Sequence, residues 1–399
     1  MQVLRGRDFR RALALLVLGP LLFVAVAGCS SLDRLPAVPK ENVARIEFLS
    51  IPEARFHLVS ESTVFSDIWV AAERRLHRTG TAAGTEHMLA LSGGAENGAF
   101  GAGILYGWTK RGDRPNFSIV TGVSTGALMA PFAFLGPKHD EALKAVYTSV
   151  TADDIAVVRS LGAILGGDSL ADTTPLLRLI ERYITPALIE EIAREHRKGR
   201  LLFIGTTDLD LAQPVVWNIG AIAASGHPRA AETIHRVLLA SAAIPGAFPP
   251  VPMDVDIDGE KRQELHVDGG VTNQVFLYPA NIPVRSLPSD IRSRPRIAWI
   301  IRNGRTLEQP TEVKRSLIPV AQRSISTMIA ANSVGDIYRM YLQTRRDNIG
   351  FRLAYLTRRF PYDASKPFDR DYMQKLFDYG QEEIRRGAAW GTKPPGFIP

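Results

Sequence analysis

The stretch FSIVTGVSTGALMAPFAFLG, residues 117–136, places a serine between two apolar runs. The run before Gly122 predicts a buried strand, and ALMAPFAFL after Gly126 predicts a helix. Glycines two residues before and after Ser124 permit the tight, strained turn that lifts a serine hydroxyl out of a sheet. The N-terminus of the following helix directs a positive field at the same point. We therefore predict that Ser124 is a nucleophile at a strand-to-helix turn; a purely structural glycine-rich turn is the alternative.

A serine nucleophile needs donors for the oxyanion that forms when it attacks a carbonyl group. LALSGGAENGAFGAG, residues 89–103, is another predicted strand-to-helix junction, and its small residues allow successive backbone N–H groups to converge on one point. A phosphate loop would carry GK[ST] after the glycines, and a dinucleotide loop would carry glycine at position 95. Neither pattern is present. We predict an oxyanion hole made by the N–H groups of Gly93, Gly94 and Ala95.

The serine also needs a base. Asp268 ends the apolar strand of ELHVDGG, and a carboxylate at a strand end, with glycines clearing space, belongs at the catalytic edge of a parallel sheet. An aspartate that serves only the turn is the alternative. Histidine is the usual base for a serine. His227 in a loop and His235 on a helix are the nearest candidates, but we expect both to be structural or solvated, and His266 to pack on its strand.

The order of elements along the chain predicts the fold class. From residue 87 onwards, strands at HMLALSGG, at LLFIGTTDLD with VVWNIGAI soon after it, and at RPRIAWIIRNG alternate with helical patterns, and VDIDGEKRQE is hairpin-like. This alternation predicts a three-layer α/β/α fold with a mostly parallel central sheet. We assign residues 87–392 to one domain, preceded by an N-terminal extension at 46–86 and a polar, proline-containing tether at 29–45.

The first 28 residues differ from the rest of the chain. MQVLRGRDFRR is basic, and the uncharged run at 12–28 is short for a membrane span and interrupted by Gly19 and Pro20. Residues 1–28 therefore predict a signal peptide. VAGC at its end resembles the lipobox of bacterial lipoproteins. This resemblance implies a lipid anchor on Cys29 and, because Ser30 follows, sorting to the outer membrane, facing the periplasm. A plain secretory signal or a short anchor is the alternative.

Composition excludes several partners and cofactors. The net charge is +7, of which residues 1–28 contribute +3 from four arginines and one aspartate, leaving +4 for the remainder. No basic run interleaved with aromatic residues is present, so we expect no nucleic-acid partner. Cys29 is the single cysteine, which excludes an internal disulfide and a cysteine metal cluster. We expect no metal and no other cofactor, and a membrane lipid as the substrate.

Four motifs in one order resemble the patatin-like phospholipase family: SGGAENG at 92–98, GVSTG at 122–126, LASAAIPGAFPPV at 239–251 and DGG at 268–270. The resemblance spans roughly residues 88–300. It implies a catalytic dyad in which Ser124 is the nucleophile and Asp268 its base, with no histidine. The implied substrates are glycerophospholipids or other fatty-acyl esters. A carboxylate is a weak base at its ordinary pKa, so we expect burial to raise the pKa of Asp268.

Two positions depart from the oxyanion motif of that family. Ala95 stands where the family has a third glycine, and Asn97 where it has a basic residue. An alanine keeps the N–H group, but it is acceptable only where φ is negative. Loss of the basic residue weakens the inference to phospholipids over neutral esters.

We predict a membrane-anchored serine acyl hydrolase of phospholipase A type that works through a covalent acyl-enzyme. A lipid-binding lipoprotein of the same fold without turnover is the first alternative. An ordinary α/β-hydrolase with a histidine base is the second, and the order of the motifs disfavours it.

Overall fold

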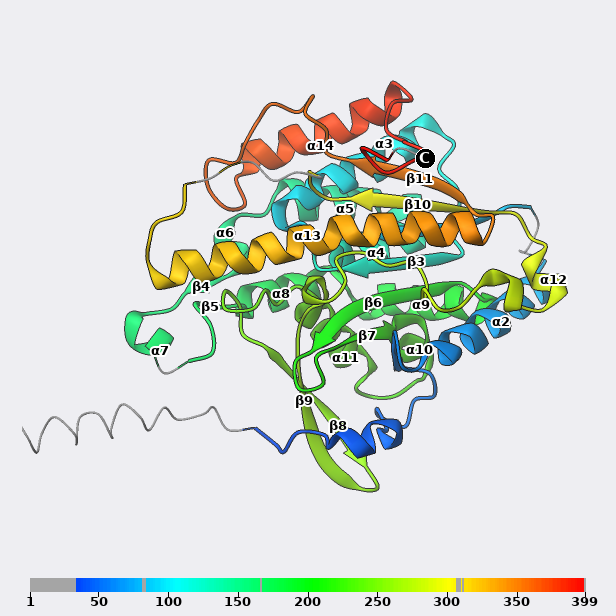
Figure 1. The fold of residues 1–399 in the computed structure, drawn as a ribbon, viewed down its shortest axis with the longest axis horizontal. Helices are drawn as coiled ribbons and strands as arrows, with labels where there is room; N and C mark the ends of the chain where they lie inside the picture. The colour runs from blue at the N-terminus through cyan, green and yellow to red at the C-terminus, as the bar shows by residue number, and fades with distance from the viewer. Residues whose placement is uncertain (1–33, 81–83, 166, 306–309, 311, 398–399) are drawn as a thin grey trace, which may run out of the picture.

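The computed structural model describes residues 34–80, 84–165, 167–305, 310 and 312–397. The predicted signal peptide and Cys29 lie outside the described residues. A nine-stranded sheet runs through the middle of the protein in the order β1-β7-β6-β3-β2-β10-β11, with β9 attached to β6 and β8 to β9 (Figure 1). The strands are β1 Arg55–His57, β2 Glu86–Leu91, β3 Ile119–Val123, β4 Val157–Val158, β5 Ala171–Asp172, β6 Leu201–Asp208, β7 Gln213–Asn218, β8 Val251–Ile257, β9 Glu260–Asp268, β10 Arg296–Arg302 and β11 Gly350–Tyr355.

Helices cover both faces of this sheet. The α-helices are α2 Ser62–Arg78, α3 Gly98–Arg111, α4 Thr125–Leu135, α5 Asp140–Thr148, α6 Ala152–Ile155, α7 Leu161–Leu165, α8 Thr174–Tyr183, α9 Pro186–Lys198, α10 Ile219–Ala224, α11 Ala230–Ser241, α12 Ser289–Arg292, α13 Leu317–Arg346 and α14 Arg370–Arg385. The 3-10 helices are η1 Lys40–Arg45, η2 Ala95–Asn97, η3 Pro137–His139, η4 Gly269–Val271 and η5 Val284–Ser286. No described helix is both long enough and apolar enough to cross a membrane.

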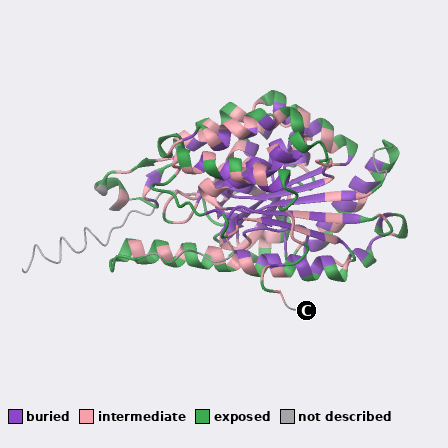
Figure 2. Ribbon diagram, turned by 90° about the horizontal axis from the view of Figure 1, so that it is seen from above, coloured by how far each residue is buried: buried purple, intermediate pink, exposed green. Residues whose placement is uncertain are grey.

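The predicted three-layer α/β/α fold is confirmed. Strands β6, β3, β2, β10 and β11 run parallel, and each is reached through helical connections. Along β2, Leu89 and Leu91 pack in one core with α3, α4 and α14, whereas Met88 and Ala90 pack in a second core with α2 and α13. Because side chains alternate across a strand, each central strand supplies both cores. Figure 2 shows these strands buried between the two helical layers.

Four strands extend the parallel core in antiparallel fashion. The hairpin predicted at VDIDGEKRQE is β8–β9, which turns at Asp258 and Gly259, both with positive φ. The strand expected at VVWNIGAI stops at Asn218, because the Asn218 side chain accepts the Ala221 N–H at 3.1 Å and caps α10.

The residues ahead of the predicted domain also contact it. Within the N-terminal extension, β1 pairs with the edge of β7, and Phe65 and Trp69 of α2 are fully buried. Arg34 forms an ion pair of 2.7 Å with Asp210.

Candidate active site

Ser124 occupies the sharp turn between β3 and α4. Its φ of 55° and ψ of −127° lie in a region that non-glycine residues rarely adopt. A Cβ on Gly122 would overlap the Gly126 carbonyl, and one on Gly126 would overlap the Leu91 carbonyl. Gly122 is therefore required for β3 to pack against the start of α4, and Gly126 for α4 to pack against the end of β2. The strained strand-to-helix turn expected from GVSTG is present.

A second serine holds this turn. The Ser124 N–H donates to Ser241 Oγ at 2.9 Å, and the Ser241 hydroxyl donates to the Gly205 carbonyl at 2.6 Å. Ser241 ends α11, and the next residues also contact the site, because the Asp268 N–H donates to the Ala243 carbonyl at 2.9 Å. The small-residue segment LASAA thus fixes Ser124 and Asp268 together. The motif is recognisable in the sequence, but nothing in it indicates this role of Ser241.

Asp268 reaches Ser124 because β3 and β9 share one edge of β6. Strand β3 pairs with β6 as far as Val123 and Gly205, and β9 arrives from the opposite direction and ends where Asp268 pairs with Thr206. The two strand ends therefore meet. We expected Asp268 at the catalytic edge of a parallel sheet; its strand β9 is antiparallel, and Thr206–Asp208 of β6, which extend past the pairing with β3, make room for it.

The Asp268 carboxylate is buried and hydrogen-bonded. It is 3% exposed, it accepts a hydrogen bond from the Gly270 N–H at 2.7 Å, and it lies next to the Ser124 hydroxyl. Burial raises the pKa of Asp268 to about 6, although the polar contacts with Ser124 and Gly270 favour the ionised form. A carboxylate with this pKa is ionised at pH 7 and accepts a proton more readily than an ordinary aspartate.

The loop after β2 approaches Ser124 from the other side. A Cβ on Gly93 would overlap the Gln274 side chain, and one on Gly94, whose φ is 154°, would overlap the Asn303 carbonyl. Asn303 braces the loop, because its N–H donates to Ser92 Oγ and its side-chain amide donates to the Ser92 carbonyl, both at 2.8 Å.

The structure corrects one predicted oxyanion donor. The Gly93 N–H donates to the Gln274 carbonyl at 3.1 Å, so it does not point at a substrate. The N–H groups of Gly94 and Ala95 donate to no acceptor among the described residues, and both residues line the cavity that holds Ser124. These two N–H groups are the donors that the geometry leaves for an oxyanion.

Ala95 also departs from expectation. We expected an alanine to be tolerated only at negative φ, but its φ is 48°. This left-handed conformation places the Cβ too close to the backbone and costs about 1–2 kcal/mol for a residue other than glycine. Asn97, the second departure, has its side-chain oxygen bonded by the Tyr372 hydroxyl at 2.7 Å, which ties the loop to α14.

The loop after β2, Ser124 and Asp268 lie within one stretch of the chain that matches a known family. The sequence model of the family described as Patatin-like phospholipase matches residues 89–281, which include the oxyanion loop, Ser124 and Asp268. Residues 89–281 form a patatin-like domain. This confirms the resemblance seen in the four motifs, and the family indicates lipid acyl hydrolase activity.

Comparison with solved structures and curated proteins adds little. The crystal structure of VipD from Legionella pneumophila is similar, with a TM-score of 0.38 and 12% sequence identity, over 76% of this chain and 67% of that chain. Comparison with curated proteins gave no match.

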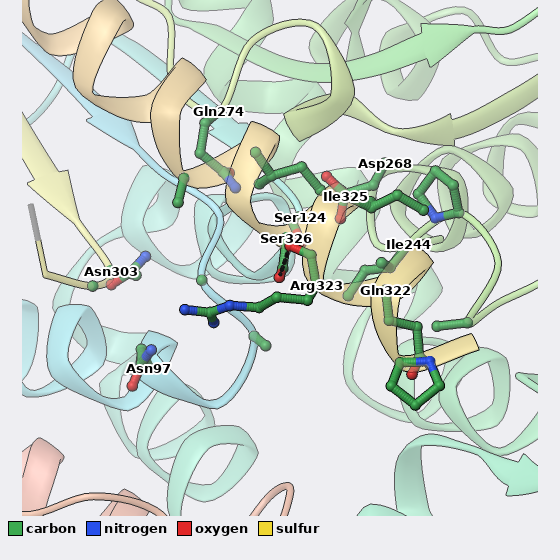
Figure 3. Close-up of a pocket in the computed structure, with 18 of the residues that line it drawn as sticks. Asn97, Ser124, Ile244, Asp268, Gln274, Asn303, Gln322, Arg323, Ile325 and Ser326 are labelled. Atoms are coloured by element: carbon green, nitrogen blue, oxygen red, sulfur yellow. Dashed lines mark hydrogen bonds between the residues drawn. The ribbon is translucent and has the colours of Figure 1, made fainter. Parts of the chain in front are cut away.

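A cavity of about 600 Å³ opens above the Ser124–Asp268 pair of the patatin-like domain. The first half of α13 forms the wall opposite Ser124 (Figure 3). Figure 3 shows Arg323 extending from α13 towards the side of the cavity that holds Asn97 and Asn303. The lining divides into polar or charged residues, Asn97, Gln274, Arg302, Asn303, Glu312, Lys314, Gln322, Arg323 and Ser326, and apolar residues, Ile244, Pro245, Ala247, Val313, Pro319, Ile325, Ile329 and Ala330.

No histidine among the described residues lines this cavity. His235 Nε2 lies 2.8 Å from the Ile184 carbonyl, and His227 lines a different surface pocket. His266 is fully buried between Thr206 and Glu264, at 2.9 and 3.1 Å. The packing expected for these histidines agrees with the structure.

One cluster away from Ser124 has the side chains of a metal site. Asp208, Glu264 and His266 place potential ligand atoms within 4.8 Å of one another. Arg55 already donates to both carboxylate oxygens of Glu264. Burial alone would raise the pKa of Glu264, but Arg55 and His266 hold it well below its usual range. Because a metal ion would have to displace the guanidinium charge, we interpret the cluster as a buried ion network.

Proposed function

We propose that the protein is a serine acyl hydrolase that cleaves fatty-acyl esters of membrane lipids with Ser124 as nucleophile and Asp268 as base. One observation carries the proposal. Ser124 lies in a strained turn with its hydroxyl next to a buried carboxylate of raised pKa, beside two N–H groups that have no acceptor among the described residues.

The reaction follows from this arrangement. Ser124 Oγ attacks the ester carbonyl while its proton passes to the Asp268 carboxylate. The N–H groups of Gly94 and Ala95 stabilise the oxyanion. Asp268 then gives the proton to the departing alcohol, and an acyl-serine remains. A water molecule that loses its proton to Asp268 attacks this ester, and the fatty acid leaves as Ser124 recovers its proton.

The cavity lining supports an amphiphilic substrate. Ile244, Ile325 and Ile329 offer an apolar wall for an acyl chain, whereas Arg302 and Arg323 lie among polar side chains where a headgroup would sit. The basic residue missing at position 97 is thus replaced by cations from outside the oxyanion loop. We propose that the substrates include phospholipids, because Arg side chains recognise phosphate well.

The proposal is tested with the full chain in a mild non-ionic detergent. We expect a fluorophosphonate probe to label the protein, labelling to disappear in Ser124→Ala, and ester hydrolysis to fall at least a thousandfold in Asp268→Asn. His227→Ala and His235→Ala are matched controls that should retain activity. Failure of the native chain to label with any lipid or detergent would favour the lipid-binding protein without turnover.

Arg323→Gln should raise KM for phosphatidylglycerol more than for a neutral diacylglycerol.

We further propose that a lipid anchor on Cys29 holds the enzyme at the periplasmic face of the outer membrane. The VAGC sequence and the single cysteine support this. Mass spectrometry of the mature protein should find a diacylated N-terminal cysteine, and Cys29→Ser should release the protein from the membrane fraction. An unmodified N-terminus elsewhere in residues 20–35 would contradict the anchor.

A further inference from the structure

The two halves of α13 differ in burial. Every buried residue of this helix lies at or after Ser333, where the second half packs on the sheet. Residues 317–332 contain no buried side chain, and Figure 2 shows this half of the long helix in the colours of exposed and intermediate residues. The first half therefore lies at the surface while it covers the cavity.

The outward face of this half is apolar. Leu317, Val320, Ala321, Ser324 and Met328 recur at the spacing of one helical face, and only Ser324 among them is polar. Leu317 is 85% exposed and Met328 59% exposed. The opposite face lines the cavity with a mixture of apolar side chains, such as Ile325 and Ile329, and polar ones, such as Gln322. An exposed apolar helix face ordinarily packs against another apolar surface rather than water.

An apolar stripe joins the two faces. Ile318, Ile325 and Ile329 follow one another along the side of the helix at intervals of seven and four residues. Ile318 is half-exposed, whereas Ile325 and Ile329 line the cavity that holds Ser124. A lipid chain entering from the outward face would pass along this stripe without crossing a charged side chain.

Charge distinguishes between the surfaces that this segment could contact. Residues 313–332 contain no acidic residue, and Lys314 and Arg315 stand at the start of the segment, directly after Glu312, whereas Arg323 extends into the cavity. Two copies of such a segment repel one another, whereas an anionic lipid surface attracts each basic residue. Charge complementarity therefore favours a membrane over a second copy of this chain.

We propose that residues 313–332 form a docking surface for an anionic lipid bilayer, with the helix lying in the plane of the headgroups and its outward face inserted. The inference rests on the proposed function, because the cavity behind the helix is taken to receive a lipid. Docking would place the mouth of the cavity at the membrane and reduce the distance over which a lipid must leave the bilayer.

The test reads out membrane contact without catalysis. The full chain carries Ser124→Ala, which removes the nucleophile, and Cys29→Ser, which removes the native cysteine. A single new cysteine, Met328→Cys, is labelled with a polarity-sensitive fluorophore. Leu342→Cys, labelled in the same way, is the matched control. Leu342 lies on the same face of α13 in its packed half and is 60% exposed. We expect vesicles of phosphatidylglycerol and phosphatidylethanolamine to shift the emission at position 328 to the blue, with no shift at 342. High salt should weaken the shift.

Three results would overturn the proposal. They are no shift at position 328, an equal shift at 342, or a shift at 328 without vesicles that grows with protein concentration. The last would assign the surface to a second copy of the chain. Arg315→Gln should weaken binding to the anionic vesicles about fivefold, as expected for one basic residue near such a surface, and leave binding to phosphatidylcholine vesicles unchanged.

A kinetic comparison separates this inference from the proposed function. In the otherwise native chain, Leu317→Gln with Met328→Gln should lower hydrolysis of vesicle lipid about tenfold and leave hydrolysis of a soluble short-chain ester within twofold. Equal loss on both substrates would contradict the docking surface. If the native chain hydrolyses neither substrate but position 328 still reports vesicle contact, the proposed function fails and the docking surface stands.

Discussion

Asp268 is a carboxylate kept almost free of water, and its raised pKa has a consequence for the reaction. With a pKa of about 6, the group is protonated in mild acid and ionised above neutrality. Because only the ionised form accepts the Ser124 proton, we expect kcat/KM for a soluble ester to rise with pH and reach half its plateau near pH 6. A pH series between 4.5 and 8.5 measures this. A profile that stays flat down to pH 4.5 would contradict the assignment of Asp268 as base.

The same shift affects stability. The pKa of Asp268 is about 6 in the folded protein and about 3.8 in the unfolded chain, so the folded state binds the proton more tightly. The stability of the parent protein therefore falls as pH rises from about 4 to 6, by up to about 3 kcal/mol from this group. Asp268→Asn should be more stable than the parent at pH 8 and similar at pH 3.5. Denaturant unfolding at both values tests this; a less stable variant at pH 8 would contradict it.

Ala95 has a backbone conformation that is unfavourable for an alanine. Its φ of 48° suits glycine, so Ala95→Gly should remove about 1–2 kcal/mol of strain and lose part of this gain to the greater freedom of glycine when unfolded. We expect a net rise of about 0.5–1 kcal/mol in the free energy of unfolding. Ala142→Gly, inside helix α5, is the control and should instead destabilise by about 1 kcal/mol. Similar losses in both variants would show that Ala95 is not strained.

At the scale of elements, the glycines after the oxyanion loop serve helix packing. A Cβ on Gly103 of α3 would overlap the Phe377 carbonyl of α14, and one on Gly380 would overlap the Phe100 carbonyl. The stretch that begins as an oxyanion loop therefore continues as the close contact between two helices. We expect Gly103→Ala to destabilise the fold by about 1–3 kcal/mol, because the helices must separate.

Gly335 on α13 is the matched control for this substitution. No atom lies within 4 Å of a Cβ placed there, so Gly335→Ala should stabilise the protein by up to about 1 kcal/mol through helix propensity alone. Chemical denaturation of both variants gives the comparison. A neutral Gly103→Ala would mean that α3 and α14 are less closely packed than described.

Local sequence patterns predicted the positions of strands and helices better than they predicted which distant segments pair with one another. The apolar run and paired glycines around Ser124 sufficed for a strand, a strained turn and a helix. The antiparallel approach of β9 could not be predicted, because it depends on three residues of β6, Thr206–Asp208, that extend past the end of β3. The hydrogen bond from the Gly93 N–H could not be predicted either, because its acceptor, the Gln274 carbonyl, is remote in sequence. Long-range pairing, rather than local propensity, decided both.

The exposure of the first half of α13 also depends on long-range contacts. The helical pattern after residue 310 predicts a long helix, but it contains no signal that only the second half finds a partner. That half is fixed by Asp336, which accepts the N–H groups of Gln274 and Val275 at 2.7 and 3.3 Å. The sequence does not indicate that the Asp336 carboxylate binds the backbone of the segment after Asp268, because the two are far apart in the chain.

At the scale of the whole molecule, an ion pair joins the N-terminal extension to β9, the strand that carries the proposed base. Arg55 of β1 pairs with Glu264 of β9, four residues before Asp268, and both side chains are buried. His266 contacts the same carboxylate. The extension therefore supports the strand that carries the proposed base, although it lies outside the matched domain.

This link predicts an asymmetric response to mutation. Arg55→Met leaves the Glu264 carboxylate buried without its strongest partner, which should lower the free energy of unfolding by about 3–5 kcal/mol. Arg55→Met combined with Glu264→Gln removes the charge as well and should recover more than half of that loss. Denaturant unfolding of the two variants and of Glu264→Gln alone completes a double-mutant cycle. If Arg55→Met costs under 1 kcal/mol, the pair does not join the extension to β9. If it costs 3 kcal/mol or more and kcat of the folded fraction also falls, the extension acts on the position of Asp268 as well as on stability.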